Sequence, residues 1–289
     1  MRYSPDVPVS TRVHFTHAVL QFLADEAGVR LLHIKGPALD PALLQRSEVG
    51  TPLLRQSTDA DILVDPRRAS DFLARLTERR FRRVAGFATG SPFGHAATIW
   101  ADDLGYADVH RFFPGVGIPA DEAFEALWAD RDTMMLAGRA CPVPSLDAQR
   151  LIILLHAARG GGRGANDREI AWEGATAQER WRVRDLAGAF GAVVPLAAAI
   201  GELDRHAEAP EYDLWDHFAN NPGHTRTEEW RARFRAARTV REKATVVWRS
   251  AMVNTDHLAM ELGRPPSRRE VAAAWFARIR RAIDERRGK

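Results

Sequence analysis

The chain has 289 residues, 45% of them hydrophobic, so it is long enough to bury a full core in one large or two modest domains. Its formal net charge is only +3, its basic residues are almost all arginine, as in a high-GC bacterial sequence, and its one cysteine, Cys141, excludes an internal disulfide. No stretch approaches the roughly 18 apolar residues of a membrane span, and residues 1–10 lack the apolar run of a signal peptide, so we expect a cytoplasmic protein.

The first predicted elements are a helix, a strand and a second helix. Apolar residues with helical spacing predict a helix over Thr11–Glu26, with Gly28 as its stop. Val29–Ile34 follows as a mostly apolar strand that ends at Lys35-Gly36-Pro37, and Pro37 favours a helix over Ala38–Gln45. A strand, a glycine and a helix N-terminus in this order predict a place for phosphate oxygens.

The middle of the chain predicts short strands interrupted by helices. These elements are a strand over Asp59–Val64, a helix from Asp65-Pro66 to about Arg79, strands over Phe81–Ala88, Ala96–Trp100 and Gly105–Phe112, a helix over Ala120–Trp128 and a hairpin over Thr133–Val143. Asp102–Gly105 has the composition of a hairpin turn, which would pair the two strands around it directly. We expect an antiparallel or mixed sheet.

Beyond Pro144 the pattern becomes helical. Ser145-Leu-Asp147 is an N-cap signal ahead of a buried helix, which Gly160–Gly164 interrupts. From Ala175 the chain reads as helices, with breaks at about Pro210–Pro222 and at Pro265-Pro266. The predicted fold class is therefore α+β, with a mixed sheet flanked by helices in residues 1–144 and an all-helical domain in residues 145–289.

Asp59 and Asp61 are the first candidate site residues. Successive side chains of a strand alternate between faces, so these two project from the same face, roughly 6.5–7 Å apart at their Cα atoms. Two like charges repel unless a cation lies between them, and a hard divalent ion with oxygen ligands is the natural occupant. A D-x-D triplet alone is also compatible with a turn-capping pair, and a second triplet, Asp130-Arg-Asp132, has the pattern of solvated charge at a helix end.

Asp108 and His110 share one face of a later strand. If that strand lies beside Asp59–Val64, three carboxylates, Asp59, Asp61 and Asp108, converge on one edge of the sheet. Three such aspartates, with a glycine turn nearby, are the parts of two-metal nucleotidyl transfer. The alternative for Asp108 is an exposed carboxylate beside the hairpin, and for His110 a half-buried sheet histidine.

These residues carry a resemblance to a known family. His33-Ile-Lys-Gly-Pro-Ala-Leu39, Gly50 and Arg55, Asp59-Ala-Asp61-Ile-Leu-Val64, His95 and Asp108-Val-His110 resemble the bacterial nucleotidyltransferase-like family of the DNA polymerase beta and kanamycin nucleotidyltransferase superfamily. The resemblance covers about residues 30–112. It implies a minimal nucleotidyltransferase fold followed by a helical domain, with Mg²⁺, or alternatively Mn²⁺, on Asp59, Asp61 and Asp108.

The turn after the first strand departs from most of the superfamily, which has Gly-Ser there. Here it is Lys35-Gly36, and we expect Lys35 to replace the serine hydroxyl as a point charge on the β- and γ-phosphates. Arg55 is a candidate triphosphate contact or else a surface ion pair. The histidines His95, His110 and His156 are candidates for substrate contact or for support of a metal ligand, although His156 also fits a core histidine.

The predicted function is transfer of a nucleoside monophosphate from an NTP, such as ATP, to an unidentified acceptor, with release of pyrophosphate. Two alternatives stay open: a module on the same fold that binds a nucleotide or a partner without turnover, and a D-x-D glycosyltransferase that holds a nucleotide-sugar. Nucleic acid is not an expected partner, because no aromatic platform interleaves with the arginine-rich C-terminal end. The acceptor, the preferred base and the oligomeric state do not follow from the sequence.

Overall fold

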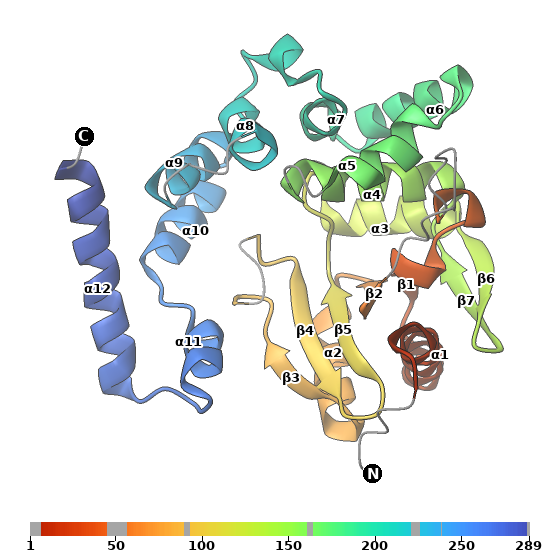
Figure 1. Cartoon of the computed structure of the whole chain (residues 1–289), viewed down its shortest axis with the longest axis horizontal. Coiled ribbons are helices and arrows are strands. Elements are labelled where there is room, and N and C mark those ends of the chain that lie inside the picture. Colours follow the sequence, from red (N-terminus) through yellow and green to blue (C-terminus); the bar gives the residue numbers. More distant parts are fainter. Residues whose placement is uncertain are drawn as a thin grey trace.

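The computed structural model describes residues 7–44, 57–89, 93–160, 164–220, 226–237 and 239–287. These residues form an α+β protein with a mixed five-stranded sheet and many helices, as predicted (Figure 1). The strands of this sheet are β1 (Leu31–Ile34), β2 (Asp59–Val64), β3 (Arg82–Ala85), β4 (Ala96–Ala101) and β5 (Gly105–His110).

The order of the strands is β1-β2-β5-β4-β3. The central strands β2 and β5 run parallel, whereas β1 with β2, β5 with β4, and β4 with β3 are antiparallel pairs. In the β2–β5 register Asp61 lies opposite Asp108, and Asp59 lies opposite Tyr106. The expectation that the two acidic strands are neighbours is therefore confirmed, and their carboxylates lie on one face of the sheet.

The opposite face of the sheet is apolar. Ile62, Val64 and Val109 belong to a buried core with side chains of α1 (Val9–Ala27) and α2 (Ala69–Arg79), which pack against the sheet. Gly28 ends α1 in the left-handed conformation at φ 59°, as the sequence predicted. The helix α2 begins later than expected, because residues 65–68 form a turn in which the backbone N–H of Arg67 donates to Asp65 Oδ1.

The helix predicted over Ala38–Gln45 is wrong in its described part. Two 3₁₀ turns, η1 (Gly36–Ala38) and η2 (Pro41–Leu43), stand there instead. Asp40 precedes a proline, which disfavours the helical region for its backbone, and it has φ −52° and ψ 140°. Its carboxylate accepts the backbone N–H of Ala42 at 2.8 Å, so it caps the second turn rather than continuing the first.

The β5 strand leads into α3 (Ala120–Ala129) and the hairpin β6 (Asp132–Leu136) and β7 (Arg139–Val143). The predicted helix over Ala120–Trp128 and the predicted hairpin are confirmed. Ala137 and Gly138 form the hairpin turn at φ 47° and φ 80°, the left-handed pair that suits the twist of a two-residue loop.

The remaining described elements are helical. They are α4 (Leu146–Gly160), α5 (Ala165–Arg168), the π-helical turn η4 (Glu169–Glu173), α6 (Ala177–Ala189), α7 (Val193–Ile200), the 3₁₀ turn η5 (Leu203–His206), α8 (Tyr212–Asn220), α9 (Arg226–Ala236), α10 (Val240–Ala251), α11 (Thr255–Leu262) and α12 (Arg268–Arg287). The helix α8 lies inside the region expected to be a break. No described helix combines the length and the apolar character that crossing a membrane would require.

A second buried core joins the sheet to the helices that follow it. Leu63 and Phe113, from β2 and from the loop after β5, cluster with Leu151 and Leu155 of α4 and with Trp215 of α8. This core therefore runs across residue 144, where the sequence pattern changes.

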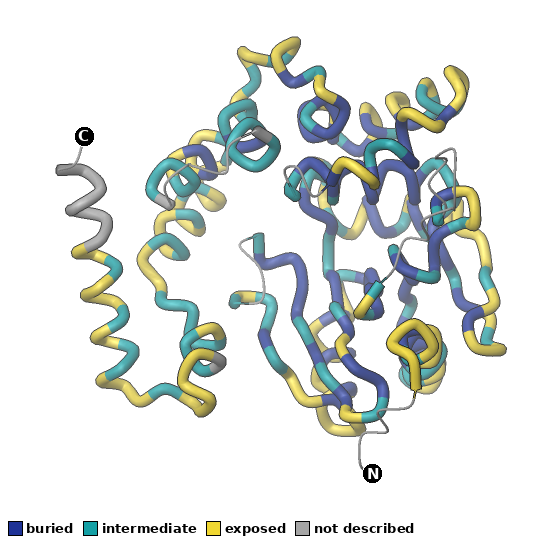
Figure 2. The backbone as a smooth tube through the Cα atoms, viewed as in Figure 1, coloured by how far each residue is buried: buried dark blue, intermediate teal, exposed yellow. Residues whose placement is uncertain are grey.

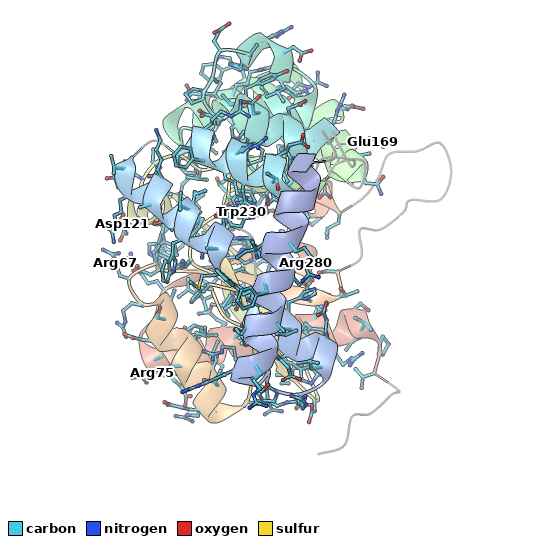
Figure 3. All side chains as sticks on the ribbon, turned by 90° about the vertical axis from the view of Figure 1, so that its left-hand side faces the viewer. Arg67, Arg75, Asp121, Glu169, Trp230 and Arg280 are labelled. Carbon is cyan, nitrogen blue, oxygen red and sulfur yellow. The ribbon has the colours of Figure 1, made fainter. Side chains whose placement is uncertain are left out.

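The helices α9–α12 lie outside that core. Figure 2 shows mostly intermediate and exposed residues along them, in contrast to the buried sheet and α4. Their apolar side chains, Trp230 and Trp275 among them, line a cavity of about 1040 Å³, with α12 in the foreground of Figure 3.

Candidate metal and phosphate site

We call the carboxylates of Asp59, Asp61 and Asp108 the acidic edge. Asp61 is the most deeply buried of the three, with 4% of its surface exposed. Its Oδ1 atom lies 2.7 Å from Lys35 Nζ and 2.7 Å from His110 Nε2. Burial alone would raise the pKa of Asp61, but the charge of Lys35 and the hydrogen bond from His110 outweigh it, so the pKa is lowered. Asp61 is therefore ionised in the folded protein at neutral pH.

Asp59 and Asp108 flank Asp61 on the same face of the sheet. Burial, the largest cause, and the charges of Asp61 and Asp108 raise the pKa of Asp59, and the opposing effects of Lys35 and Ser57 do not offset them. Asp108 Oδ1 accepts a hydrogen bond of 2.7 Å from Thr98 Oγ1 on β4. Burial and the nearby charge of Asp61 thus both disfavour the ionised form of Asp59, and a cation beside it would act in the opposite direction.

Three side chains come close enough to share a metal ion. One ligand atom each from Asp61, Asp108 and His110 lies within 4.8 Å of the others. The carboxylate oxygens are hard donors of the type that Mg²⁺ and Mn²⁺ prefer, and a cation there would offset the repulsion between the neighbouring carboxylates. The donor set therefore fits a divalent ion, although the close group contains His110 rather than Asp59, so the predicted trio of aspartates is not the closest set.

The Lys35-Gly36 turn brings the ammonium group to the carboxylates. Lys35 has φ 61° and ψ −178°, a conformation that residues other than glycine adopt at a cost of about 1–3 kcal/mol. Gly36 has φ 54°, and a Cβ there would lie 3.0 Å from Ser57 Cβ and from Ser57 Oγ. The turn therefore requires glycine at residue 36 and holds Lys35 under strain.

His95 lies beside His110, with 5.1 Å between the ring centroids. Its side chain is buried, and burial together with the charges near it lowers its pKa to about 2, so the ring is neutral. His95 Nε2 accepts from Arg159 Nη1 at 3.4 Å. The structure thus brings His95 to the site, through His110 on one side and Arg159 on the other.

His156 and Arg55 have different outcomes. The His156 side chain is 43% exposed and its Nδ1 lies 3.5 Å from Asp167 Oδ2, so it is not a core histidine. The contact with Asp167 raises the pKa of His156, but burial and the positive charges of Lys35 and Arg159 outweigh it. Arg55 lies outside the described residues, and its predicted contact with phosphate stays a prediction.

Three residues at the site were not predicted from the sequence. Ser57 Oγ donates to the backbone oxygen of Asp59 at 2.8 Å and packs against Gly36. Thr98 holds Asp108, and Arg159 bonds to His95. Thr98 could have been found by pairing the β4 and β5 hairpin in register, whereas nothing in the sequence distinguishes Arg159 from the many other arginines.

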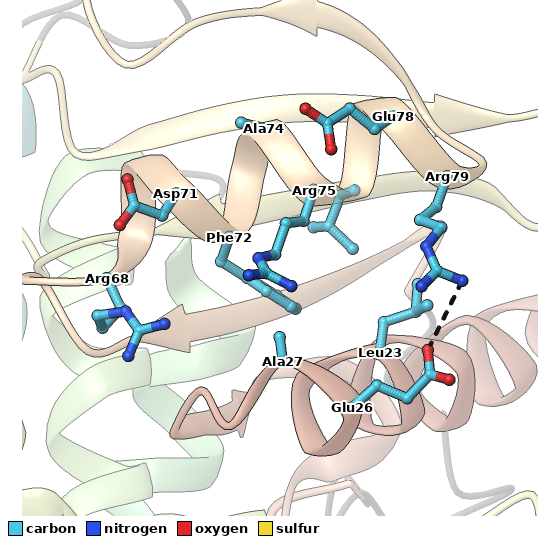
Figure 4. A pocket seen from close by; sticks show the side chains of 11 residues that line it. Leu23, Glu26, Ala27, Arg68, Asp71, Phe72, Ala74, Arg75, Glu78 and Arg79 are labelled. Atoms are coloured by element: carbon cyan, nitrogen blue, oxygen red, sulfur yellow. Dashed lines mark ion pairs between the residues drawn. The ribbon is translucent and has the colours of Figure 1, made fainter.

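Another hollow lies between α1 and α2, away from the carboxylates. It has a volume of about 580 Å³, and its walls carry charges of both signs, including Glu26, Asp71 and Arg75 (Figure 4). Arg79 and Glu26 approach to 4.0 Å across it. Neither metal-ligand geometry nor a core histidine is found among its lining residues, and it belongs to the packing of the two helices on the far face of the sheet.

Comparison with solved structures finds two weak matches. No protein-family model and no curated protein matches the chain. A lincomycin-bound structure of the lincosamide antibiotic adenylyltransferase LnuA is 15% identical with a TM-score of 0.33, over 58% of this chain and 92% of that one. An antigenic nucleotidyltransferase-like protein from Paracoccidioides brasiliensis is 15% identical with a TM-score of 0.38, over 66% of this chain and 93% of that one. Both TM-scores are too low to assign this chain to either protein's family.

Proposed function

We propose that this chain is a metal-dependent nucleotidyltransferase, which moves a nucleoside monophosphate from an NTP to an acceptor and releases pyrophosphate. The observation that carries the proposal is the placement of Asp61 directly opposite Asp108 on parallel neighbouring strands, with the Lys35 ammonium bonded to Asp61. Carboxylates for a divalent ion and a cation for phosphate thus meet on one face of the sheet.

Each residue has a role in this proposal. Asp61 and Asp108 would hold the ion, Mg²⁺ or Mn²⁺, with Asp59 beside them. A bound divalent ion would neutralise charge on the phosphates and on the departing pyrophosphate, and would promote ionisation of the attacking group. His110 donates to Asp61 and fixes its carboxylate, while Lys35 supplies a positive charge for the phosphate chain. Catalysis then needs positioning and charge neutralisation rather than a covalent nucleophile.

Transfer of label from α-³²P-labelled NTPs to small-molecule and macromolecular fractions of a bacterial extract tests this function. With Mg²⁺ we expect labelled product together with released pyrophosphate, and UDP-sugars should not replace the NTPs. Asp108→Asn should lower the rate at least about 100-fold, because it removes a metal ligand that acts on the transition state. The matched control is Asp132→Asn, in the other D-x-D triplet, which is exposed on β6 and should keep full activity. Equal rates in both variants would contradict the proposal.

A second candidate is a module that binds a nucleotide without turnover. The Lys35–Asp61 ion pair favours it, because a buried carboxylate that already has a cation needs no metal for neutralisation. Calorimetry with ATP separates the two. Binding that requires no Mg²⁺ and is the same in Asp59→Asn would support the module, whereas metal-dependent binding weakened by that substitution supports the enzyme.

A further inference from the structure

The guanidinium of Arg159 forms no ion pair with a carboxylate in the described part of the chain. It stands in the last turn of α4, 5.3 Å from the ring centroid of Phe113 and 5.7 Å from that of Phe93. Its polar contact is with the neutral His95, and its Nε atom is buried without a hydrogen-bond partner. Burial lowers its pKa to about 10, and the charge of Asp61, which acts in the opposite direction, does not offset that effect.

Three other partly or fully buried arginines of this chain are paired with acids, whereas the partly buried Arg111 bonds to the backbone oxygen of Gly94 and lies over Phe87 and Phe112. Arg150 bonds to Glu179, Arg233 to Glu229, and Arg30 to both Asp65 and Glu125. Withdrawing an arginine from water without an anion costs free energy, and aromatic rings return only part of it. Arg159 is therefore prepared for an anion that the chain itself does not supply among its described residues.

The position of Arg159 indicates which anion would bind to it. His95 connects it to His110, and His110 bonds to Asp61 in the acidic edge. The charges of Arg159 and Lys35 both lower the pKa values of His95 and His156, so the two cations lie near the same pair of histidines. A ligand held at the acidic edge through a divalent ion would extend its remaining negative charge toward this region.

We propose that Arg159 binds the polyphosphate chain of the nucleotide, so that α4 completes the site built on the sheet. The proposal rests on the function proposed above for its ligand, an NTP whose pyrophosphate departs. Phe93 and Phe113 hold the planar guanidinium in place, and His95, neutral and buried, accepts one of its N–H groups. The other N–H groups of the planar guanidinium would then donate hydrogen bonds to phosphate oxygens.

Calorimetry with inorganic tripolyphosphate tests the role of Arg159 without turnover. Arg159→Met should weaken binding at least about tenfold, since a hydrogen bond to a charged group is lost. Arg159→Lys should recover part of the affinity, because it restores the charge but not the fork. The matched control is Arg184→Met, which removes an arginine that lies over Trp172 and pairs with Glu202, and should leave the affinity unchanged. Circular dichroism confirms that each variant is folded.

Kinetics with an NTP supply a second readout. Arg159→Met should raise KM for the NTP and leave the affinity for the nucleoside unchanged, whereas a merely structural role would weaken the binding of both the NTP and the nucleoside. Tripolyphosphate affinity equal to that of the wild-type protein in a folded Arg159→Met variant would overturn the proposal. Arg159-dependent binding without pyrophosphate release from any NTP would leave Arg159 as a polyphosphate ligand and refute nucleotidyl transfer instead.

Discussion

Lys35 is the residue on which the candidate site depends most. Its backbone adopts a conformation that costs about 1–3 kcal/mol in residues other than glycine, and its side chain, which is 11% exposed, is paired with Asp61. The strained conformation is maintained because the ion pair with Asp61 holds the side chain of Lys35, and Ser57 lies close to Gly36 on the other side of the turn. Strained residues of this kind are concentrated at functional sites, which agrees with a role for Lys35 in phosphate binding.

Lys35→Met should lower the free energy of unfolding at pH 7 by about 3 kcal/mol, because it leaves the buried Asp61 carboxylate without its cation. A carboxylate whose pKa is lowered by folding stabilises the protein above its unfolded pKa, about 3.9, and this contribution is lost as the pH falls below that value. The difference between the two proteins should therefore be largest at neutral pH and shrink below about pH 4. Urea denaturation at pH 7 and pH 3.5 measures it.

Lys243→Met is the matched control, since Lys243 lies over the ring of Phe234 and forms no ion pair with a carboxylate among the described residues. It should change the free energy of unfolding by about 1 kcal/mol or less. If the free energy of unfolding falls equally in the two lysine variants, the Lys35–Asp61 ion pair does not contribute to stability beyond an ordinary surface lysine. The double variant Lys35→Met, Asp61→Asn should recover part of the loss, because the unpaired charge is then gone.

The carboxylates of the site could be predicted from the sequence, and their setting could not. Asp59, Asp61 and Asp108 follow from the two-residue period of strands, a local property. The bond between His110 and Asp61, the support of Asp108 by Thr98 and the approach of Arg159 depend on strand register and on the docking of α4. Such contacts join residues far apart in the chain, and no local pattern carries them.

At the scale of elements, α1 and β1 meet through two buried histidines. His17 Nδ1 and His33 Nδ1 lie 2.8 Å apart, and His33 Nε2 lies 3.0 Å from Gln21 Oε1. That amide oxygen only accepts, so His33 donates from Nε2, and the Nδ1 of a neutral His33 accepts from His17. Burial lowers the pKa of His17 to about 4 and that of His33 well below its usual value.

This pair predicts a loss of stability in mild acid. The unfolded chain takes up a proton on His17 at about pH 6.5, whereas the folded protein does so only near pH 4. The free energy of unfolding should therefore fall by about 1.4 kcal/mol per pH unit for each such histidine as the pH drops through this range. His17→Gln should remove the contribution of one histidine from the slope of the free energy of unfolding against pH. Urea denaturation between pH 7 and pH 5 measures this slope.

The control for this prediction lies on the same helix. His14 is exposed, and its Nδ1 contacts the backbone oxygen of Ser10. A reduction of the slope in His14→Gln equal to that in His17→Gln would assign the effect to the denatured chain rather than to the buried pair, and an unchanged slope in His17→Gln would refute the role of the pair outright.

Elements with strong apolar periodicity were predicted correctly, and those whose sequence signals compete were not. The helix α1, the strands β2 and β4 and the β6–β7 hairpin agree with their patterns. The segment after Gly36 carries helix-favouring Pro37 but also Pro41, and the second proline prevails. Pro210 precedes α8 rather than preventing a helix in this region, and Trp215 of that helix is anchored in the core.

At the scale of the whole molecule, burial separates a well-packed part, the sheet with α4–α8, from the poorly buried helices α9–α12, and this division differs from the one that the sequence pattern predicts. The sheet and α4–α8 share a core, whereas Ala232 and Arg233 are the buried residues among the described parts of α9–α12. The division into residues 1–144 and 145–289 stays a proposal, and the shared core implies that the two parts unfold together. Regions with few buried apolar contacts open most readily, so α9–α12 should be the least stable part.

Leu154→Ala tests this organisation, because Leu154 of α4 is 0% exposed inside the shared core. It should lower the free energy of global unfolding by about 2–5 kcal/mol, through lost burial and the cavity left behind. Native-state hydrogen exchange should then show faster exchange in β2 and β5 as well as in α4, while α10 and α12, already fast in the wild type, change little. The matched control is Leu262→Ala, a change at a 38% exposed leucine that should cost about 0.5 kcal/mol or less. Acceleration confined to α4–α8, with the sheet unaffected, would show that the sheet has a stability of its own and that a boundary near residue 144 separates two independent folding units.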